Sequence, residues 1–216
     1  DDVESRGLGD VYKRQIEESP TAFHAAANVE ALLLENGFEK LENLAEGALV
    51  PGGSYYTMQN GSAVLAVKIP ENPAKGFRIA ASHSDSPCFK IKEVPEMKVE
   101  NTYVKLNVEK YGGMILSPWL DRPLSVAGRV FVAGKDGKPE AKLVNLKKDL
   151  LIIPNVAIHF NREINNGFAY NPQTDMAPLM GLDQELSIKK LCAEAVDVAE
   201  EEILGSDLYV LSLIHI

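Results

Sequence analysis

Residues Phe77–Lys92 read FRIAASHSDSPCFKIK, and this stretch organises the interpretation of the whole chain. Its first five residues, Phe77–Ala81, form a short, largely apolar run, which predicts a buried strand. His83 and Asp85 follow directly, and Pro87 comes next. Because proline has no N–H to donate to a strand ladder, we expect the strand to end before Pro87. His83 and Asp85 would then lie at the carboxyl end of a strand, where open α/β sheets bind their ligands.

The spacing of His83 and Asp85 suggests a metal site or a proton-transfer site. Side chains two residues apart in an extended chain point to the same side. The Asp85 carboxylate can then accept a hydrogen bond from one ring nitrogen of His83, which leaves the other nitrogen to bind a metal or to take a proton. The alternative is a structural histidine that a neighbouring aspartate holds in a turn. The spacing alone leaves both interpretations open.

The composition argues against several classes of protein. The 216 residues suffice for one large domain or two small ones, and the apolar share of 45% is that of a globular protein. The net charge is -9 without a basic run, so we expect no nucleic-acid partner, which would need clustered Lys and Arg. No apolar run approaches a membrane span and no signal peptide is visible, so we expect no membrane association. Cys88 and Cys192 show no metal-binding spacing and favour a reducing, cytoplasmic location.

The two ends of the chain differ in character from the rest. Residues 1–15 (DDVESRGLGDVYKRQ) have no apolar period, and residues 211–216 (LSLIHI) add an abrupt apolar tail to an acidic segment. Both resemble translated adaptor sequence, and we expect both to be non-native. The alternative is an N-terminus without regular structure and a genuine final strand. If the ends are non-native, the natural sequence covers residues 16–210 and belongs to a longer protein.

Periodicity and turn signals predict the main elements. We expect a helix to begin at Ser19-Pro20 and to end at Asn36-Gly37. A hairpin around Asn60-Gly61 and the strand described above complete a mixed α/β segment. Beyond Lys92 the pattern changes to short strands and hairpins with one helix, so we expect a domain boundary there. The elements expected beyond this boundary are strands within residues 94–108, a hairpin over 127–146, a helix over 188–199 and a strand from 207.

Three features of the second half can be interpreted structurally. Trp119 stands beside Asp121-Arg122, which we interpret as a buried anchor with a local ion pair; a fixed turn at an interface is the alternative. His159 lies in an apolar neighbourhood, where a histidine is more often structural than functional. Glu200–Glu202 are interpreted as a solvated helix end and not as a carboxylate site.

Several segments together resemble the aspartyl aminopeptidase family, the M18 metallopeptidases. The segments keep the order and spacing of that family, and they are Ser19–His24, Ala81–Lys92, Tyr111–Gly113, Trp119–Val130 and Ile153–Arg162. The resemblance implies an α/β catalytic-domain fragment with an inserted, mostly β dimerisation domain. Residues 16–92 would then be the N-terminal part of the catalytic domain, and residues 93–210 the inserted domain.

The resemblance also implies roles for individual residues. The family binds two zinc-type ions, and His83 matches a metal ligand while Asp85 matches the residue that orients it. His159 matches a histidine that reaches the active site of the partner subunit, which replaces the structural interpretation. The bridging aspartate, the catalytic glutamate and the other metal ligands of the family have no match here and would lie beyond the last residue.

The function that the resemblance implies is hydrolysis of the N-terminal residue of peptides by a homo-oligomeric zinc aminopeptidase. The usual preference of the family is for N-terminal Asp or Glu, although some members take apolar residues. Since one histidine cannot supply the ligands of two metal ions and a base, we expect this chain by itself to be inactive.

Two other classes of function stay open. Cys88 lies near His83 and could be the nucleophile of a thiol enzyme, although a cysteine in an apolar stretch is usually inert. The strand-rich half could instead be a non-catalytic, self-associating module. Inhibition by iodoacetamide, inhibition by a chelator, and light scattering with and without metal would separate these classes.

Overall fold

The computed structural model describes residues 15–42, 49–72 and 76–212. The chain divides into two compact units, Asp1–Ser86 and Pro87–Ile216. This division falls before Pro87 and not after Lys92, because strand β4 already begins at Cys88 and pairs within the second unit. Residues 1–14 and 213–216, most of the two ends expected to be non-native, lie outside the described residues.

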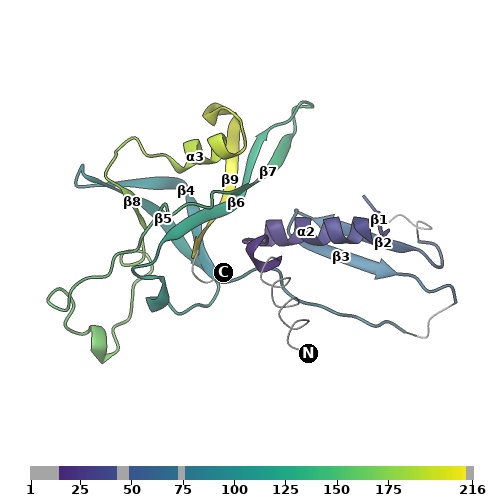
Figure 1. Ribbon diagram of the computed structural model, residues 1–216, viewed down its shortest axis with the longest axis horizontal. Coiled ribbons are helices and arrows are strands. Elements are labelled where there is room, and N and C mark those ends of the chain that lie inside the picture. The colour runs from purple at the N-terminus through teal and green to yellow at the C-terminus, as the bar shows by residue number, and fades with distance from the viewer. Residues whose placement is uncertain (1–14, 43–48, 73–75, 213–216) are drawn as a thin grey trace, which may run out of the picture. The chain divides into compact units, whose positions relative to one another are not determined.

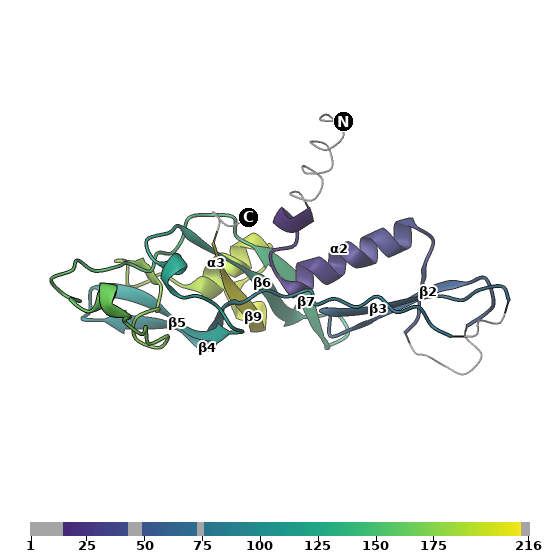
Figure 2. The ribbon, with the colours of Figure 1, turned by 90° about the horizontal axis from the view of Figure 1, so that it is seen from below.

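The first unit consists of a helix and a small sheet. Helix α2 (Ala22–Glu35) lies over one face of the sheet (Figure 2). The strand order is β1-β2-β3, with β1 and β2 parallel and β2 and β3 antiparallel. The strands are β1 (Glu39–Lys40), β2 (Ser54–Gln59) and β3 (Ala63–Lys68). Among the residues of this unit that the structure describes, the buried apolar side chains come from the helix and from β2, and they are Phe23, Ala26, Tyr55 and Tyr56.

Helix α2 begins later than the sequence predicted and ends where it predicted. Thr21, not Ser19, is the N-cap residue. The Ser19 hydroxyl instead accepts a hydrogen bond from Asn28 Nδ2 at 2.9 Å. At the other end Asn36 is the C-cap, and Gly37 has φ of +76°, a left-handed conformation that glycine adopts without strain.

The predicted buried strand at Phe77–Ala81 is absent, and this prediction was wrong. Residues 77–87 have no regular secondary structure. In the described part of the chain no strand pairs with them, and Phe77 and Ile79 are 92% and 86% exposed. A strand is stable only when a neighbour satisfies its backbone groups. The local sequence has the apolar character of a strand but cannot supply that neighbour.

The second unit is built on a six-stranded sheet with the order β7-β6-β9-β4-β5-β8 (Figure 1). All of its strand pairs are antiparallel. The strands are β4 (Cys88–Val99), β5 (Tyr103–Tyr111), β6 (Leu124–Ala133), β7 (Pro139–Asn145), β8 (Leu179–Gly181) and β9 (Ile203–Ser212). The helical elements are α3 (Ile188–Ala195) and the 3-10 turns η1 (Ser117–Trp119), η2 (Ile164–Asn166) and η3 (Glu200–Glu202).

One face of this sheet and helix α3 enclose the core. Alternate strand residues are fully or almost fully buried there, among them Phe89, Leu106, Val126, Val130 and Val210. Helix α3 contributes Ile188, Cys192 and Ala193. Strand β9 continues through Leu211 and Ser212, which are buried and pair with Ser125 and Leu124. The two residues thus extend a central strand, although we assigned them to the non-native tail.

Both hairpins that the turn residues predicted are present. Between β2 and β3, Asn60 and Gly61 have φ of 53° and 65°, the positive values that this dipeptide favours. Strands β6 and β7 form the second hairpin, closed at Ala133 and Pro139. Helix α3 is shorter than predicted, and Glu200–Glu202 form a separate 3-10 turn in which Glu201 and Glu202 are exposed. Within the described ranges, no helix combines the length and apolar character needed to cross a membrane.

Candidate metal-ligand site

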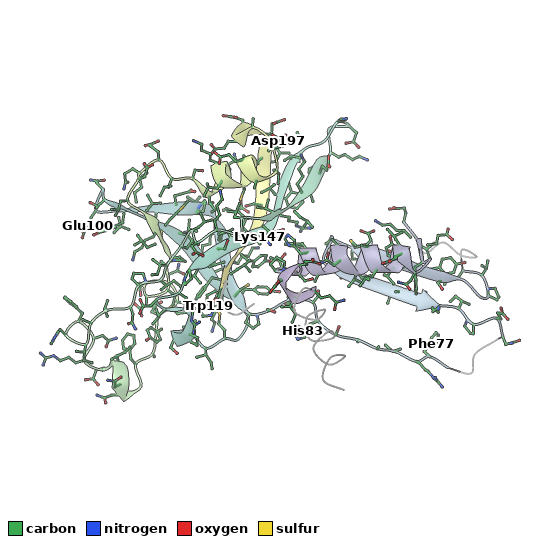
Figure 3. The ribbon with its side chains drawn as sticks, viewed as in Figure 1. Phe77, His83, Glu100, Trp119, Lys147 and Asp197 are labelled. Atoms are coloured by element: carbon green, nitrogen blue, oxygen red, sulfur yellow. The ribbon has the colours of Figure 1, made fainter. Side chains whose placement is uncertain are left out.

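His83 lies on the irregular segment that leads from Phe77 to β4 (Figure 3), and Asp85 of the same segment is its hydrogen-bond partner. Nδ1 of His83 is 2.9 Å from the carbonyl oxygen of Asp85 and 3.2 Å from its carboxylate atom Oδ1. A carbonyl and an ionised carboxylate can only accept hydrogen bonds, so the partners assign the proton of the neutral ring to Nδ1. Nε2 then keeps a lone pair, which is the form of imidazole that binds a metal or takes a proton.

The pair is open to solvent. The side chain of His83 is 82% exposed and that of Asp85 is 41% exposed. Ser84, between them, donates a hydrogen bond from its hydroxyl to the carbonyl of Ser62 at 3.3 Å, which ties this segment to the β2–β3 turn. An exposed contact between a carboxylate and an imidazole adds less than about 1 kcal/mol of stability. The contact therefore orients the His83 ring more than it stabilises the fold.

The donor set fits part of a zinc site. An imidazole nitrogen held by a carboxylate or carbonyl behind it is a common zinc ligand. Within residues 15–42, 49–72 and 76–212, however, no group of three or more His, Cys, Asp or Glu side chains is arranged to hold a metal ion. His83 therefore offers one ligand, and the other ligands would have to come from elsewhere.

His159 belongs to the second unit and lies in the long connection between Ile153 and Met176. Its side chain is exposed, and no described residue forms a hydrogen bond or an ion pair with it. A satisfied core histidine, the interpretation from the residues alone, is therefore excluded. The neighbouring apolar side chains are exposed too, namely Val156, Ile158 and Phe160.

The cysteines give no support to a thiol enzyme. Cys192 is fully buried in the core, and this burial raises the pKa of its thiol to about 12, which keeps it neutral. Cys88 is half-buried at the first position of β4, opposite Tyr111. The thiol of Cys192 is thus withdrawn from solvent, and Cys88 is part of a paired strand.

A second titratable cluster joins α2 to β1 and β2 in the first unit. Glu30 Oε1 accepts hydrogen bonds from Lys40 Nζ at 2.8 Å and from the Tyr56 hydroxyl at 3.0 Å. The bond from Lys40 lowers the pKa of Glu30, and the same bond raises the pKa of Lys40. Burial, followed by the bond to Glu30, raises the pKa of Tyr56. The cluster fastens the helix to the sheet, which makes it structural.

Sequence reasoning missed one polar contact in the second unit. Asp121 forms no ion pair with Arg122 in the described part of the chain; its Oδ1 instead accepts a hydrogen bond from the backbone N–H of Asn155 at 2.8 Å. A signal was present, because Pro154 has no N–H and Asn155 therefore carries the first backbone donor after Ile153. The sequence could not show which acceptor would take it.

Comparison with known proteins identifies the family. The family model described as "Aminopeptidase I zinc metalloprotease (M18)" matches residues 15–213. The chain belongs to the M18 family of metallopeptidases. A Clostridium acetobutylicum relative named "Probable M18 family aminopeptidase 2" is 44% identical over 202 residues, which cover 90% of this chain and 47% of the relative. The M18 chain described here thus spans about half the length of the curated relatives it matches.

Solved structures support the same fold. A chain of the cryo-EM structure of the Ape4 and Nbr1 complex is 31% identical with a TM-score of 0.84, covering 92% of this M18 chain and 42% of that chain. Chaetomium thermophilum mApe1 is 29% identical with a TM-score of 0.82, covering 94% of this chain and 50% of that chain. The mixed α/β architecture expected from the sequence is therefore confirmed.

Proposed function

We propose that this chain is the amino-terminal part of a zinc aminopeptidase and that His83 is one of its metal ligands. One observation carries the proposal. Nδ1 of His83 donates its hydrogen bond to oxygens of Asp85, so Nε2 keeps its lone pair and can bind a metal ion. The zinc metalloprotease description of the family supports the choice of metal. Bound zinc would supply Lewis-acid catalysis for hydrolysis of a peptide bond.

Three further parts of the proposal follow the resemblance to the family. The first unit, through Ser86, contributes to the catalytic domain, and the second unit, from Pro87, is an inserted dimerisation domain; the sequence alone had put this boundary after Lys92. The whole enzyme binds two metal ions and removes N-terminal residues, by preference Asp or Glu, from peptides. Asp85 orients the ligand His83 and does not bind the metal itself.

His159 acts, in this proposal, at the active site of a second subunit. Its exposure supports this role, because a buried histidine could not reach another chain. Exposed apolar side chains gathered on one loop are a feature of interaction surfaces. Once there, the ring would donate a hydrogen bond or a positive charge to an acidic side chain or a carbonyl oxygen of the peptide.

The 216-residue chain alone should be inactive. Catalytic zinc sites use about three protein ligands for one ion, and His83 is one. The described residues offer no group of three candidate ligands.

The test joins this sequence to its natural continuation and measures release of N-terminal Asp, Glu and Leu from peptides. A chelator should abolish the activity and added zinc should restore it. His83→Ala should lose one metal ion and nearly all activity, whereas His24→Ala, a change at the other histidine of the first unit, should keep its metal. Chelator-sensitive turnover by the 216-residue chain, or full metal content in His83→Ala, would contradict the proposal.

The exposed loop around His159 is also the observation that favours a non-catalytic, self-associating module. Light scattering of the 216-residue chain with and without zinc addresses this alternative. Association that needs no zinc, together with a completed chain that lacks peptidase activity, would favour the module over the enzyme.

A further inference from the structure

His159 lies in a loop, residues 154–160, which we call the His159 loop. The segment before this loop is fixed by hydrogen bonds and packing as far as Ile153. The N–H of Leu124 donates to the carbonyl of Leu151 at 2.9 Å, and the N–H of Asp121 donates to the carbonyl of Ile153 at 2.9 Å. The side chain of Ile153 is fully buried in the core. Backbone bonds and packing thus fix this segment of the second unit.

Beyond Ile153 the packing stops, and the one backbone bond within residues 154–160 is local, from the N–H of Phe160 to the carbonyl of Ala157 at 2.9 Å. Pro154 has no N–H, and every residue from Pro154 to Phe160 is exposed. The first restraint after the proline is the hydrogen bond from the N–H of Asn155 to Asp121 Oδ1, at 2.8 Å. The side-chain oxygen of Asn155 then accepts a bond from the N–H of Val156, at 2.9 Å. Because packing does not hold these residues, the bond to Asp121 is what ties the start of the loop to the rest of the second unit.

Asp121 adopts a strained conformation that makes this contact possible. Its φ of +55° lies in the left-handed region, which costs a non-glycine residue about 1–2 kcal/mol. In that conformation the N–H of Asp121 donates a hydrogen bond to the carbonyl of Ile153, and its carboxylate accepts one from the N–H of Asn155. These two partners flank Pro154 in the sequence. Trp119, two residues before Asp121, is buried, and its ring packs edge-on against Phe89 with the ring centroids 5.1 Å apart.

We propose that Asp121 is a positioning residue for His159: its carboxylate sets the direction of the loop from Asn155 and so places the histidine for its task. This inference rests on the proposed function, in which His159 serves the active site of a second subunit. The contact between Asp121 and the loop can, however, be measured without any activity.

Substitutions at two aspartates separate the carboxylate from the backbone conformation. Asp121→Gly permits a φ of +55° but removes the acceptor, whereas Asp121→Asn keeps an oxygen acceptor and tolerates the left-handed region. Asp197→Gly is the matched control, because Asp197 is exposed, lies in the same unit and also has φ of 55°.

Amide hydrogen exchange in the full chain provides the first readout. Asp121→Gly should accelerate exchange of the Asn155 and Val156 amides, which are hydrogen-bonded at the start of the loop, by about tenfold or more, as loss of a hydrogen bond to a charged group would. Asp121→Asn and Asp197→Gly should leave these rates within about twofold of the unaltered chain, a smaller change than loss of one such bond produces. Unchanged exchange in Asp121→Gly would overturn the proposal.

Kinetics of the completed enzyme provide the second readout. Asp121→Gly should lower kcat by about 10- to 100-fold, the cost of a misplaced group, and Asp121→Asn should recover most of it. In a His159→Phe background, Asp121→Gly should have little further effect, because no histidine remains to be placed. An equal loss with and without His159 would show that Asp121 acts on general stability, and the positioning role would be overturned. If His159→Phe itself leaves activity intact, the proposed role of His159 fails, and the positioning role fails with it.

Discussion

Nδ1 of His83 contacts two oxygens of a single residue, the carbonyl oxygen of Asp85 at 2.9 Å and its carboxylate at 3.2 Å. Since the shorter contact is to the backbone, the tautomer of His83 does not depend on the Asp85 side chain alone. A change of that side chain should therefore weaken the orientation of the ring without abolishing it.

The first prediction concerns metal affinity. In the completed enzyme, Asp85→Asn should keep the fold and lower zinc affinity by about 10- to 100-fold, because the carboxylate behind the ligand is lost while the carbonyl stays. Calorimetric zinc titration measures this, with circular dichroism as the check on folding. Ser82→Ala, in the same exposed segment, is the control. Zinc affinity and turnover in Asp85→Asn equal to those of the parent would show that Asp85 does not orient the ligand.

The second prediction concerns the action of His159 across an interface. His83→Ala subunits should be inactive when alone, and His159→Phe subunits should keep only a small residual activity. After subunit exchange, one site of each mixed dimer has an intact His83 and receives an intact His159, so up to about half of the sites in such a dimer should work. Activity after mixing, compared with each variant exchanged against itself, measures this. Proven exchange without recovered activity would mean that His159 serves its own subunit or has a structural role.

The third prediction follows from the lowered pKa of Glu30. The hydrogen bond from Lys40 stabilises the charged carboxylate in the folded state. Its contribution is complete above the usual pKa of 4.5 and is lost as the pH falls through the lower folded-state pKa. Because the Lys40 side chain is 42% exposed, solvent screening limits the contribution to less than about 1 kcal/mol.

Thermal unfolding across the acid range tests this contribution. Glu30→Gln should be less stable than the parent at neutral pH, and the difference should disappear in acid. Glu35→Gln, at the exposed end of the same helix, is the control and should show a smaller difference. A deficit in Glu30→Gln that persists at low pH would have to come from packing and not from charge.

The fourth prediction concerns the close approach of strands β6 and β9. A Cβ added at Gly128 would meet the carbonyl oxygen of Asp207 and lie 2.9 Å from the Cα of Leu208. Gly128→Ala should therefore destabilise the protein by about 1–3 kcal/mol, the usual cost of overpacking. Gly205→Ala, on the neighbouring strand, is the control because open space surrounds that position. Urea denaturation compares the two, and equal midpoints would show that the sheet adjusts without cost.

Features that depend on a few consecutive residues could be predicted from the sequence. The positive φ values at Gly37, Asn60 and Gly61 followed from residue type, and so did the helix end and the hairpin there. The contact between His83 and Asp85 was also predicted, because two residues of extended chain suffice to make it. The roles of both residues in metal binding stay predictions.

Features that depend on distant partners could not be predicted. Phe77–Ala81 has the composition of a strand, yet strand formation needs a neighbour that no local pattern supplies. Asp121 was assigned to the adjacent Arg122, but the structure gives it Asn155, 34 residues away. The exposure of His159 likewise depends on how the loop leaves a core that forms elsewhere in the sequence.

The exposed segment Phe77–Ala81, which pairs with no strand in the described part of the chain, also affects the solubility of the protein. Two large apolar side chains on an unpaired backbone form a template onto which the same segment of another molecule can stack. Arg78 stands between Phe77 and Ile79 and is the one charge in this five-residue run. Stacking identical chains would bring these guanidinium groups together, so we expect Arg78 to oppose aggregation. A chain with an uncharged residue at this position should precipitate at concentrations at which the natural sequence stays dissolved.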